Sequence, residues 1–141
     1  MKTTDTPLRV LIADGSHDFM DVARRWLILH PCVGTVSAVY SGVEALETVG
    51  AGQVDLVLLD ARLPDMDGFE ATRQIKSTAT PPLVVILVLF DYQAVRDEAA
   101  AAGADACIDK TVLTRALSPV LPGFMEQITE RQAPGKPTAP P

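Results

Sequence analysis

The sequence is poor in basic residues and in cysteine, and it has no long apolar run. Its 12 Lys and Arg residues are outnumbered by 18 Asp and Glu residues, which gives a formal net charge of −6. A nucleic-acid surface requires a basic stripe, so we expect this chain not to bind DNA. The two cysteines, Cys32 and Cys107, form no cluster of the kind that holds a metal, and we expect both to be ordinary buried thiols.

No apolar run is long enough to cross a membrane, since the longest covers only residues 83–90 and a span needs ~20 residues. Residues 1–7 lack the apolar segment of a signal peptide, so we expect a cytoplasmic protein without a membrane partner. A length of 141 residues, 48% of them hydrophobic and 21% charged, predicts one globular domain. We place that domain at residues 8–132, between an N-terminal lead (1–7) and a proline-rich tail (133–141) that is expected to be disordered.

The stretch that organises the chain is an apolar run that ends on a carboxylate. Residues 54–59 are apolar apart from Asp55, as in a strand buried on both faces. The run ends at Asp60, and residues 63–68, Leu-Pro-Asp-Met-Asp-Gly, then require a turn. Many buried strands end on Asp, so Asp60 taken alone is best interpreted as a strand end or a helix cap.

The order of the other elements predicts an α/β fold. Strands are expected at residues 8–13, 35–39, 54–59, 83–90 and 106–108, and five helices alternate with them. Right-handed crossovers then favour a doubly wound, five-stranded parallel sheet with strand order 2-1-3-4-5. In this order Asp14 and Asp60 end adjacent strands, and Lys110, which follows the fifth strand, reaches the same edge.

Two helices are predicted in more detail. Ser16 is a candidate N-cap for a helix whose apolar face is Phe19, Val22, Ala23 and Trp26. The last helical pattern, between residues 117 and 128, contains Pro119 and Pro122. Pro119 suits a first turn and Pro122 would bend the helix, so we expect a late start near Ser118 or two short pieces.

The three polar residues at the sheet edge favour phosphoryl chemistry. Two neighbouring carboxylates, Asp14 and Asp60, attract a hard cation such as Mg²⁺, and Lys110 can pair with Asp60 or with a phosphoryl oxygen. An aspartate beside a metal and a lysine can act as a nucleophile and form an aspartyl phosphate. A structural Asp–Lys pair is the alternative, and for Lys110 alone it is the favoured one.

Residues 60–68, Asp-Ala-Arg-Leu-Pro-Asp-Met-Asp-Gly, resemble the phosphorylation loop of the receiver domains of bacterial response regulators. Residues 102–105, Ala-Gly-Ala-Asp, followed by Lys110, resemble the fifth-strand region of the same family. The resemblance implies a flavodoxin-like fold with Asp60 as the phosphoacceptor and Lys110 as the phosphate contact. It also implies a Mg²⁺ site formed by Asp14, Asp60 and the backbone carbonyl of Arg62.

The sequence departs from this family at three positions. Gly15 stands where receivers carry a second acid, Val88 where they carry a Ser or Thr, and Cys107 where they carry an aromatic switch residue. By this resemblance, Gly15 removes a metal ligand. Val88 removes a hydrogen bond to a charged phosphoryl oxygen, which is worth about 1.5–3 kcal/mol. Cys107 removes the aromatic side chain whose rotation distinguishes the two states of the switch. His17 or Asp18 could replace the missing acid, although a role in the first turn of a helix is the safer interpretation.

The resemblance therefore implies an atypical single-domain receiver in two-component signalling, with weak Mg²⁺ binding and no enzymatic activity of its own. Its expected partners are a histidine kinase or phosphotransfer protein and a downstream signalling protein, and a homodimer is left open. The main alternative is a pseudo-receiver, an interaction module that works without phosphorylation. A flavodoxin-like phosphate binder is disfavoured because Asp14 would repel phosphate, and a phosphoaspartate hydrolase because no second acid accompanies Asp60.

Overall fold

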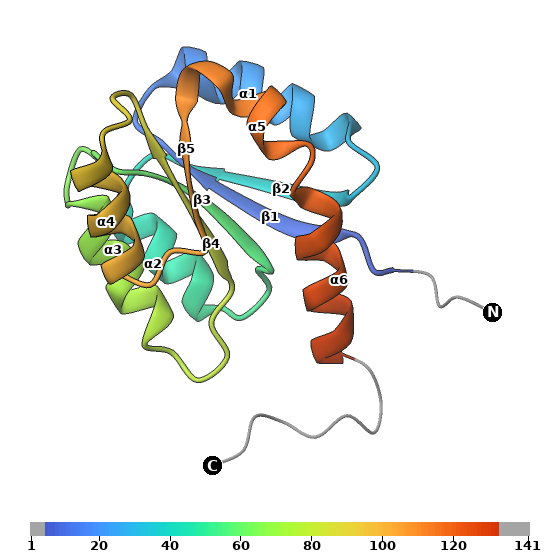
Figure 1. Ribbon diagram of the computed structural model, residues 1–141. Coiled ribbons are helices and arrows are strands. Elements are labelled where there is room, and N and C mark those ends of the chain that lie inside the picture. Colours follow the sequence, from blue (N-terminus) through green and yellow to red (C-terminus); the bar gives the residue numbers. More distant parts are fainter. Residues whose placement is uncertain (1–4, 133–141) are drawn as a thin grey trace.

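Five parallel strands form one sheet in the order β2-β1-β3-β4-β5 in the computed structural model, which describes residues 5–132 (Figure 1). The strands are β1 (Leu8–Ala13), β2 (Val33–Val39), β3 (Leu56–Asp60), β4 (Leu83–Val88) and β5 (Ala106–Asp109). Every neighbouring pair is parallel, so the predicted fold class and strand order are confirmed.

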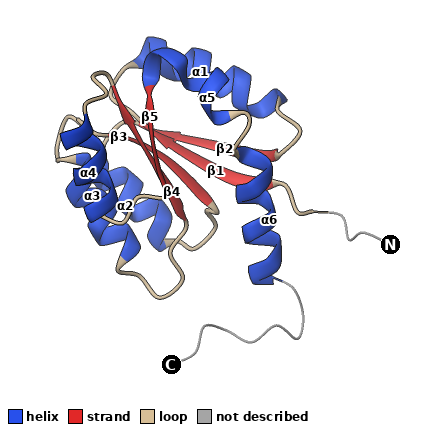
Figure 2. Ribbon diagram, viewed as in Figure 1, coloured by secondary structure: helices blue, strands red, loops and turns tan. Residues whose placement is uncertain are grey.

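Helices cover both faces of this sheet (Figure 2). The helices are α1 (His17–Leu29), α2 (Gly42–Gly50), α3 (Gly68–Lys76), α4 (Gln93–Ala101), α5 (Leu113–Leu117) and α6 (Leu121–Gln132), with the 3-10 turn η1 (Lys110–Val112) before α5. Side chains of α1, α5 and α6 share one core cluster, and those of α2, α3 and α4 share the other. Successive residues of β3 and β4 alternate between the two clusters, which is why β4 is apolar along its whole length and β3 is apolar up to Asp60.

Side-chain caps begin three of the helices, and one of them is the predicted cap Ser16. Ser16 Oγ accepts a hydrogen bond from the backbone N–H of Phe19 at the start of α1. Ser41 caps α2 in the same way, and Asp67 caps α3. Because each cap satisfies a backbone N–H that the helix itself leaves free, these residues fix where the helices start.

The buried stripe of α1 differs from the predicted one. Met20, Ala23 and Leu27 are buried, whereas Val22 is 66% exposed. Phe19 and Trp26 only flank the core. Apolar residues occupy two overlapping helical stripes here, and only the packing against β1 and β2 selects between them.

The end of the chain forms two helices, so the described part has six α-helices and not five. Of the two predicted alternatives, a late start near Ser118 or two short pieces, the structure shows two pieces, of which only α5 is short. The positions of the two prolines differ from the predicted ones. Pro119 lies in the break between α5 and α6, and Pro122 is the second residue of α6. A first-turn proline needs no backbone N–H, so Pro122 starts the helix and does not bend it.

Strand β4 is shorter than predicted, because it ends at Val88. Leu89 and Phe90 continue the apolar run but are 59% and 68% exposed in the loop that follows. The predicted tail, residues 133–141, lies outside the described residues. Within residues 5–132, no helix has both the length and the apolar character needed to cross a membrane.

A buried carboxylate joins β1 to β3 at the amino edge of the sheet. Asp55 accepts hydrogen bonds from the backbone N–H of Arg9 (2.9 Å) and from its guanidinium Nε (3.0 Å) and Nη2 (2.9 Å). The hydrogen bond to Asp55 raises the pKa of Arg9. Asp55 is the only charged residue inside the apolar run 54–59, and these three bonds explain how it is tolerated there.

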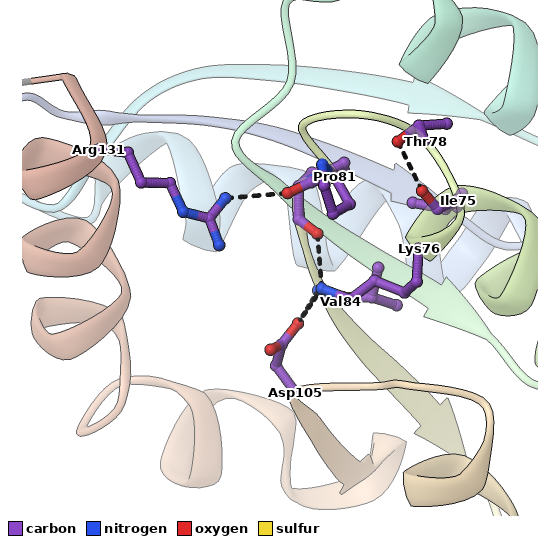
Figure 3. A network of polar contacts seen from close by, with 8 residues as sticks. Ile75, Lys76, Thr78, Pro81, Val84, Asp105 and Arg131 are labelled. Carbon is purple, nitrogen blue, oxygen red and sulfur yellow. Dashed lines mark hydrogen bonds and ion pairs between the residues drawn. The ribbon is translucent and has the colours of Figure 1, made fainter. Parts of the chain in front are cut away.

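A second polar network holds β4 and β5 together at the same edge (Figure 3). Asp105 Oδ2 accepts hydrogen bonds from Val84 N (2.8 Å) and from Lys76 Nζ at the end of α3 (2.9 Å). Arg131 of α6 donates to the carbonyl oxygen of Pro81 (2.9 Å). Polar contacts therefore join neighbouring strands at the amino edge, and the residues that make them have a structural role.

We expect Asp55→Ala to lower the free energy of unfolding by about 2–3 kcal/mol, because it leaves a partly buried guanidinium and a backbone N–H without their acceptor. Glu70→Ala is the control. Glu70 pairs with Arg73 at 3.5 Å on the surface of α3, and its loss should cost less than about 0.5 kcal/mol. Urea denaturation of the two variants measures the difference, and equal effects would contradict this role for Asp55.

Candidate functional site

Three predicted side chains meet at the carboxyl edge of the sheet. Asp14 follows β1, Asp60 is the last residue of β3, and Lys110 follows β5. The Nζ atom of Lys110 lies 2.6 Å from Asp14 Oδ2 and 3.6 Å from Asp60 Oδ2. Asp60 Oδ1 accepts a hydrogen bond from the backbone N–H of Arg62 (3.0 Å), which fixes the orientation of the carboxylate.

Lys110 is held mainly by Asp14 and by an aromatic ring. Its Nζ atom lies 4.5 Å from the centroid of the Phe19 ring, a distance at which the face of the ring attracts a cation. With a carboxylate at 2.6 Å and the ring beside it, the ammonium group is closer to Asp14 than to Asp60. The site therefore contains two carboxylates and one ammonium group, whose formal charges sum to −1.

Asp14 is almost completely buried, with a relative exposure of 1%. Its Oδ1 atom accepts a hydrogen bond from the backbone N–H of Ser16 (2.8 Å). Its Oδ2 atom accepts no hydrogen bond of regular geometry within the described part of the chain, and its close contact is the ion pair with Lys110. A buried oxygen in this state is suited to a cation.

The environment of Asp60 favours its protonated form. Burial makes the largest contribution, and together with the charge of Asp14 it raises the pKa of Asp60 above its ordinary value. The hydrogen bond from Arg62 and the charge of Lys110 act in the opposite direction but do not cancel the effect of burial. A cation near Asp60 would lower this pKa by stabilising the carboxylate.

The oxygen atoms of Asp14 and Asp60 are of the type that Mg²⁺ prefers as ligands. The number of carboxylates at this edge is small, however. Among residues 5–132, no group of three or more His, Cys, Asp or Glu side chains is placed to hold a metal. Gly15 provides no donor, and a Cβ atom there would lie 3.1 Å from Pro64 Cγ, a tight contact. Nor does His17 complete the set: its ring stacks on Tyr40, with centroids 4.3 Å apart.

The loop after Asp60 folds back on the strand that precedes it. The backbone N–H of Gly68 donates to the carbonyl oxygen of Ala61 (2.9 Å). A Cβ atom at Gly68 would collide with the backbone of Asp60 and Ala61. Only glycine permits this close approach, which explains the glycine at the end of the loop.

The loop after Asp60 also makes a long-range contact with α2 that the sequence does not predict. The carboxylate of Asp65 accepts hydrogen bonds from the backbone N–H groups of Gly42 (2.7 Å) and Val43 (3.0 Å) at the start of α2. These two bonds lower the pKa of Asp65. Met66 packs where a side chain at Gly42 would lie. The glycine that follows Ser41 is the one local signal of this docking, and it does not identify the partner.

A cavity of about 480 Å³ opens beside Asp60, between its loop and the loop after β4. Its walls include the buried Val88 and the exposed Leu89, Phe90 and Tyr92. Val88 carries no hydroxyl, so this wall cannot donate a hydrogen bond from that position. Both cysteines are free thiols, and Cys32 is buried as predicted. Cys107, in β5, is only half-buried, although burial still raises the pKa of its thiol.

Comparisons with known proteins agree with these features. A family model described as the response regulator receiver domain matches residues 10–121. Protein-glutamate methylesterase/protein-glutamine glutaminase 4 of Myxococcus xanthus is 35% identical over 122 residues, which cover 84% of this chain and 32% of that protein. Response regulator MprA of Mycobacterium sp. (strain KMS) is 28% identical over 131 residues, which cover 93% of this chain and 56% of that protein. The chain thus spans about a third to just over half of the length of these relatives.

Solved structures give the same result. A receiver domain protein (CheY-like) of Methanospirillum hungatei superposes with a TM-score of 0.79 at 23% identity, covering 91% of this chain and 100% of the other. The response regulator domain of Thermotoga maritima CheB superposes with a TM-score of 0.74 at 25% identity, covering 89% of this chain and 98% of the other. With the family match, the strand order and the edge at which Asp14, Asp60 and Lys110 meet, the chain belongs to the response regulator receiver domain family.

Proposed function

We propose that this receiver domain accepts a phosphoryl group on Asp60, inefficiently, and that its signalling depends more on association with partners than on its phosphoryl state. The observation that carries the proposal is the convergence of Asp14, Asp60 and Lys110 within 3.6 Å of the lysine nitrogen at one sheet edge. The complete loop from Leu63 to Gly68 supports the same role, because a domain that never uses Asp60 has no need to position it so closely.

In the transfer step, a carboxylate oxygen of Asp60 attacks the phosphorus of a phosphohistidine. The new P–O bond forms as the P–N bond breaks, and the imidazole leaves with the electron pair of the P–N bond. Lys110 Nζ, 3.6 Å from Asp60 Oδ2, is near enough to contact a phosphoryl oxygen there. Because Lys110 also pairs with Asp14, that contact would compete with the existing ion pair.

Asp14, Asp60 and the backbone carbonyl of Arg62 would hold Mg²⁺ if it binds. The ion would then screen the carboxylates from the negative charge of the incoming phosphoryl group. Two features argue for weak binding: Gly15 provides no third carboxylate, and the Lys110 ammonium already neutralises part of the charge that attracts the ion.

The partners follow from the family. Receiver domains interact with histidine kinases or phosphotransfer proteins and are in general not enzymes themselves. We infer that a kinase or phosphotransfer protein supplies the phosphoryl group, and that a downstream signalling protein responds to this domain in the cytoplasm. The net charge of −6 supports a protein partner rather than DNA.

A pseudo-receiver is the second candidate function, and three positions favour it. Val88 removes a hydroxyl from the wall beside Asp60, Cys107 replaces an aromatic switch side chain, and Gly15 removes an acid. With all three changes, a phosphoryl group on Asp60 would make few contacts that differ between the inactive and the active conformation, so it could shift their populations only slightly. In this function, Asp60 and Lys110 would serve only as a structural ion pair.

Phosphorylation by a small acyl phosphate separates the two functions. We expect partial addition of one phosphoryl group in the presence of Mg²⁺, measured as intact mass, and none in Asp60→Asn. Asp67→Asn, which changes an acid of the same loop, is the control and should still be modified. No modification of the wild type at any Mg²⁺ concentration would favour the pseudo-receiver, and rapid full conversion would contradict the inefficiency proposed here.

Restoring the missing acid should strengthen metal binding. We expect Gly15→Asp to tighten Mg²⁺ binding on the order of 10-fold, because a third carboxylate adds Coulomb attraction and an oxygen ligand. Gly15→Asn, which has nearly the same size and no charge, should improve it much less, since it meets the same contact with Pro64. Calorimetric titration measures both constants, and equal constants for the two variants would show that charge at position 15 does not limit binding.

The charge of Asp60 should also affect stability. In metal-free buffer at pH 7, we expect Asp60→Asn to raise the free energy of unfolding by about 0.5–2 kcal/mol, because it removes a half-buried charge close to Asp14. Asp14→Asn should lower it, since Lys110 then loses its nearest carboxylate.

The pH dependence of this effect has a defined sign. The pKa of Asp60 is higher in the folded protein than in the unfolded chain, so the wild type loses stability as the pH rises through this interval. The advantage of Asp60→Asn should therefore be complete above the folded pKa and disappear toward pH 3, where Asp60 is protonated. Denaturation at several pH values measures it, and an advantage that does not change with pH would contradict this assignment of the charge.

A further inference from the structure

Strand β2 is an edge of the sheet that carries no charge. Its seven residues, Val-Gly-Thr-Val-Ser-Ala-Val, include no charged residue and no proline, and no strand among residues 5–132 pairs with its outer side. Gly34, Thr35 and Ser37 are exposed. The opposite edge, β5, is only four residues long, and two acids flank it, Asp105 before it and Asp109 at its end. Proteins usually prevent an edge strand from pairing with another chain by placing charged residues or prolines in it or by keeping it short. Strand β2 has seven residues and neither a charged residue nor a proline.

The sequence of β2 is almost symmetric about its central residue. Val33 corresponds to Val39, Gly34 to Ala38, and Thr35 to Ser37, with Val36 in the middle. Two antiparallel copies of such a strand place each residue opposite one of the same kind. Valine pairs and Thr–Ser pairs directly across from each other both stabilise an antiparallel ladder.

The surface beside this edge also suits a second copy of the chain. A cavity of about 460 Å³ lies between α1 and β2, and its lining includes Val36 and the exposed Ile28. Asp21, Arg24 and Arg25 of α1 line the same cavity. Because both signs of charge are present on one small surface, two copies related by a two-fold axis can place opposite charges together.

We propose that two copies of this chain associate through β2, antiparallel and about a two-fold axis at Val36, and so form a continuous ten-stranded sheet. In this arrangement Thr35 of each copy faces Ser37 of the other. The strand supplies backbone hydrogen bonds, and Ile28 and Val36 supply apolar contact next to the axis. One seven-residue strand is a small interface, so the dimer is weak and forms in the micromolar range.

The dimer is independent of the proposed phosphoryl chemistry. The strand order places β1 between β2 and β3, so the association site is separated from Asp60, and β5 at the opposite edge takes no part in it. A failure of Asp60 to accept a phosphoryl group leaves the dimer unaffected. Conversely, a monomeric chain would leave the function of Asp60 as proposed.

Charge variants of β2 test the pairing. Sedimentation equilibrium from micromolar to near-millimolar concentration should show a reversible dimer of the wild type. In Thr35→Lys/Ser37→Lys, like charges face each other twice, and the association constant should fall by about 10-fold or more. In the matched variant Thr35→Lys/Ser37→Glu, each lysine faces a glutamate, and the dimer should persist. Both side chains are exposed in the monomer, so neither change disturbs the core.

Hydrogen exchange of the wild type provides a second measurement that does not depend on the folding of any variant. Backbone amides of β2 should exchange more slowly as the protein concentration rises, whereas those of β5 should not change. A wild type that stays monomeric over the whole range overturns the proposal. So does a dimer that the double lysine variant leaves intact while folded, or one in which protection increases elsewhere and not in β2.

Discussion

Burial of the sheet on both faces is the constraint on which the other features depend. With helices packed over each face, every side chain in the middle of β1, β3 and β4 must be apolar, and polar chemistry is confined to the ends of the strands. At the amino edge the polar groups, Asp55 and Asp105, are fully engaged in holding strands together. At the carboxyl edge, Asp14 Oδ2 makes an ion pair with Lys110 but accepts no hydrogen bond of regular geometry within the described residues, and Asp60 accepts one such bond, from the backbone of Arg62. The same constraint thus separates an edge that is cross-linked for stability from the edge that carries the candidate site.

At the carboxyl edge, the position of the Lys110 ammonium group determines how well the charge of each aspartate is compensated. Lys110 lies against Asp14 and the Phe19 ring, so the buried carboxylate is compensated without a metal ion. Asp60 receives less of that compensation, and burial accordingly favours its protonated form. Lys110 thus neutralises one of the two carboxylate charges at this edge. A cation that binds here has to compete with the ion pair between Lys110 and Asp14.

The sequence predicts what depends on local pattern. The strands, their order, the Ser16 cap of α1 and the convergence of Asp14, Asp60 and Lys110 all follow from apolar runs and from the residues that end them. The errors arise where two patterns overlap or where the partner is remote. The stripe of α1 was ambiguous because Val22 and Met20 both have helical spacing, and Leu89 and Phe90 extend an apolar run beyond the strand. The bonds from Gly42 and Val43 to Asp65 join residues more than 20 positions apart, and the glycine at position 42 does not identify its partner.

The attachment of the loop to α2 determines which side of the site can move. Asp65 occupies the positive end of the α2 dipole through two hydrogen bonds, and Met66 fills the space left by the missing side chain of Gly42. Displacing this loop would require breaking both bonds or carrying α2 along with it. The opposite wall, with the exposed Leu89, Phe90 and Tyr92, has no comparable anchor within the described residues apart from the Asp91–Arg96 ion pair at the start of α4. The two walls of the site therefore differ in their attachment: the loop after Asp60 is anchored to α2, and the loop after β4 is the wall that can move without displacing a helix of the opposite side.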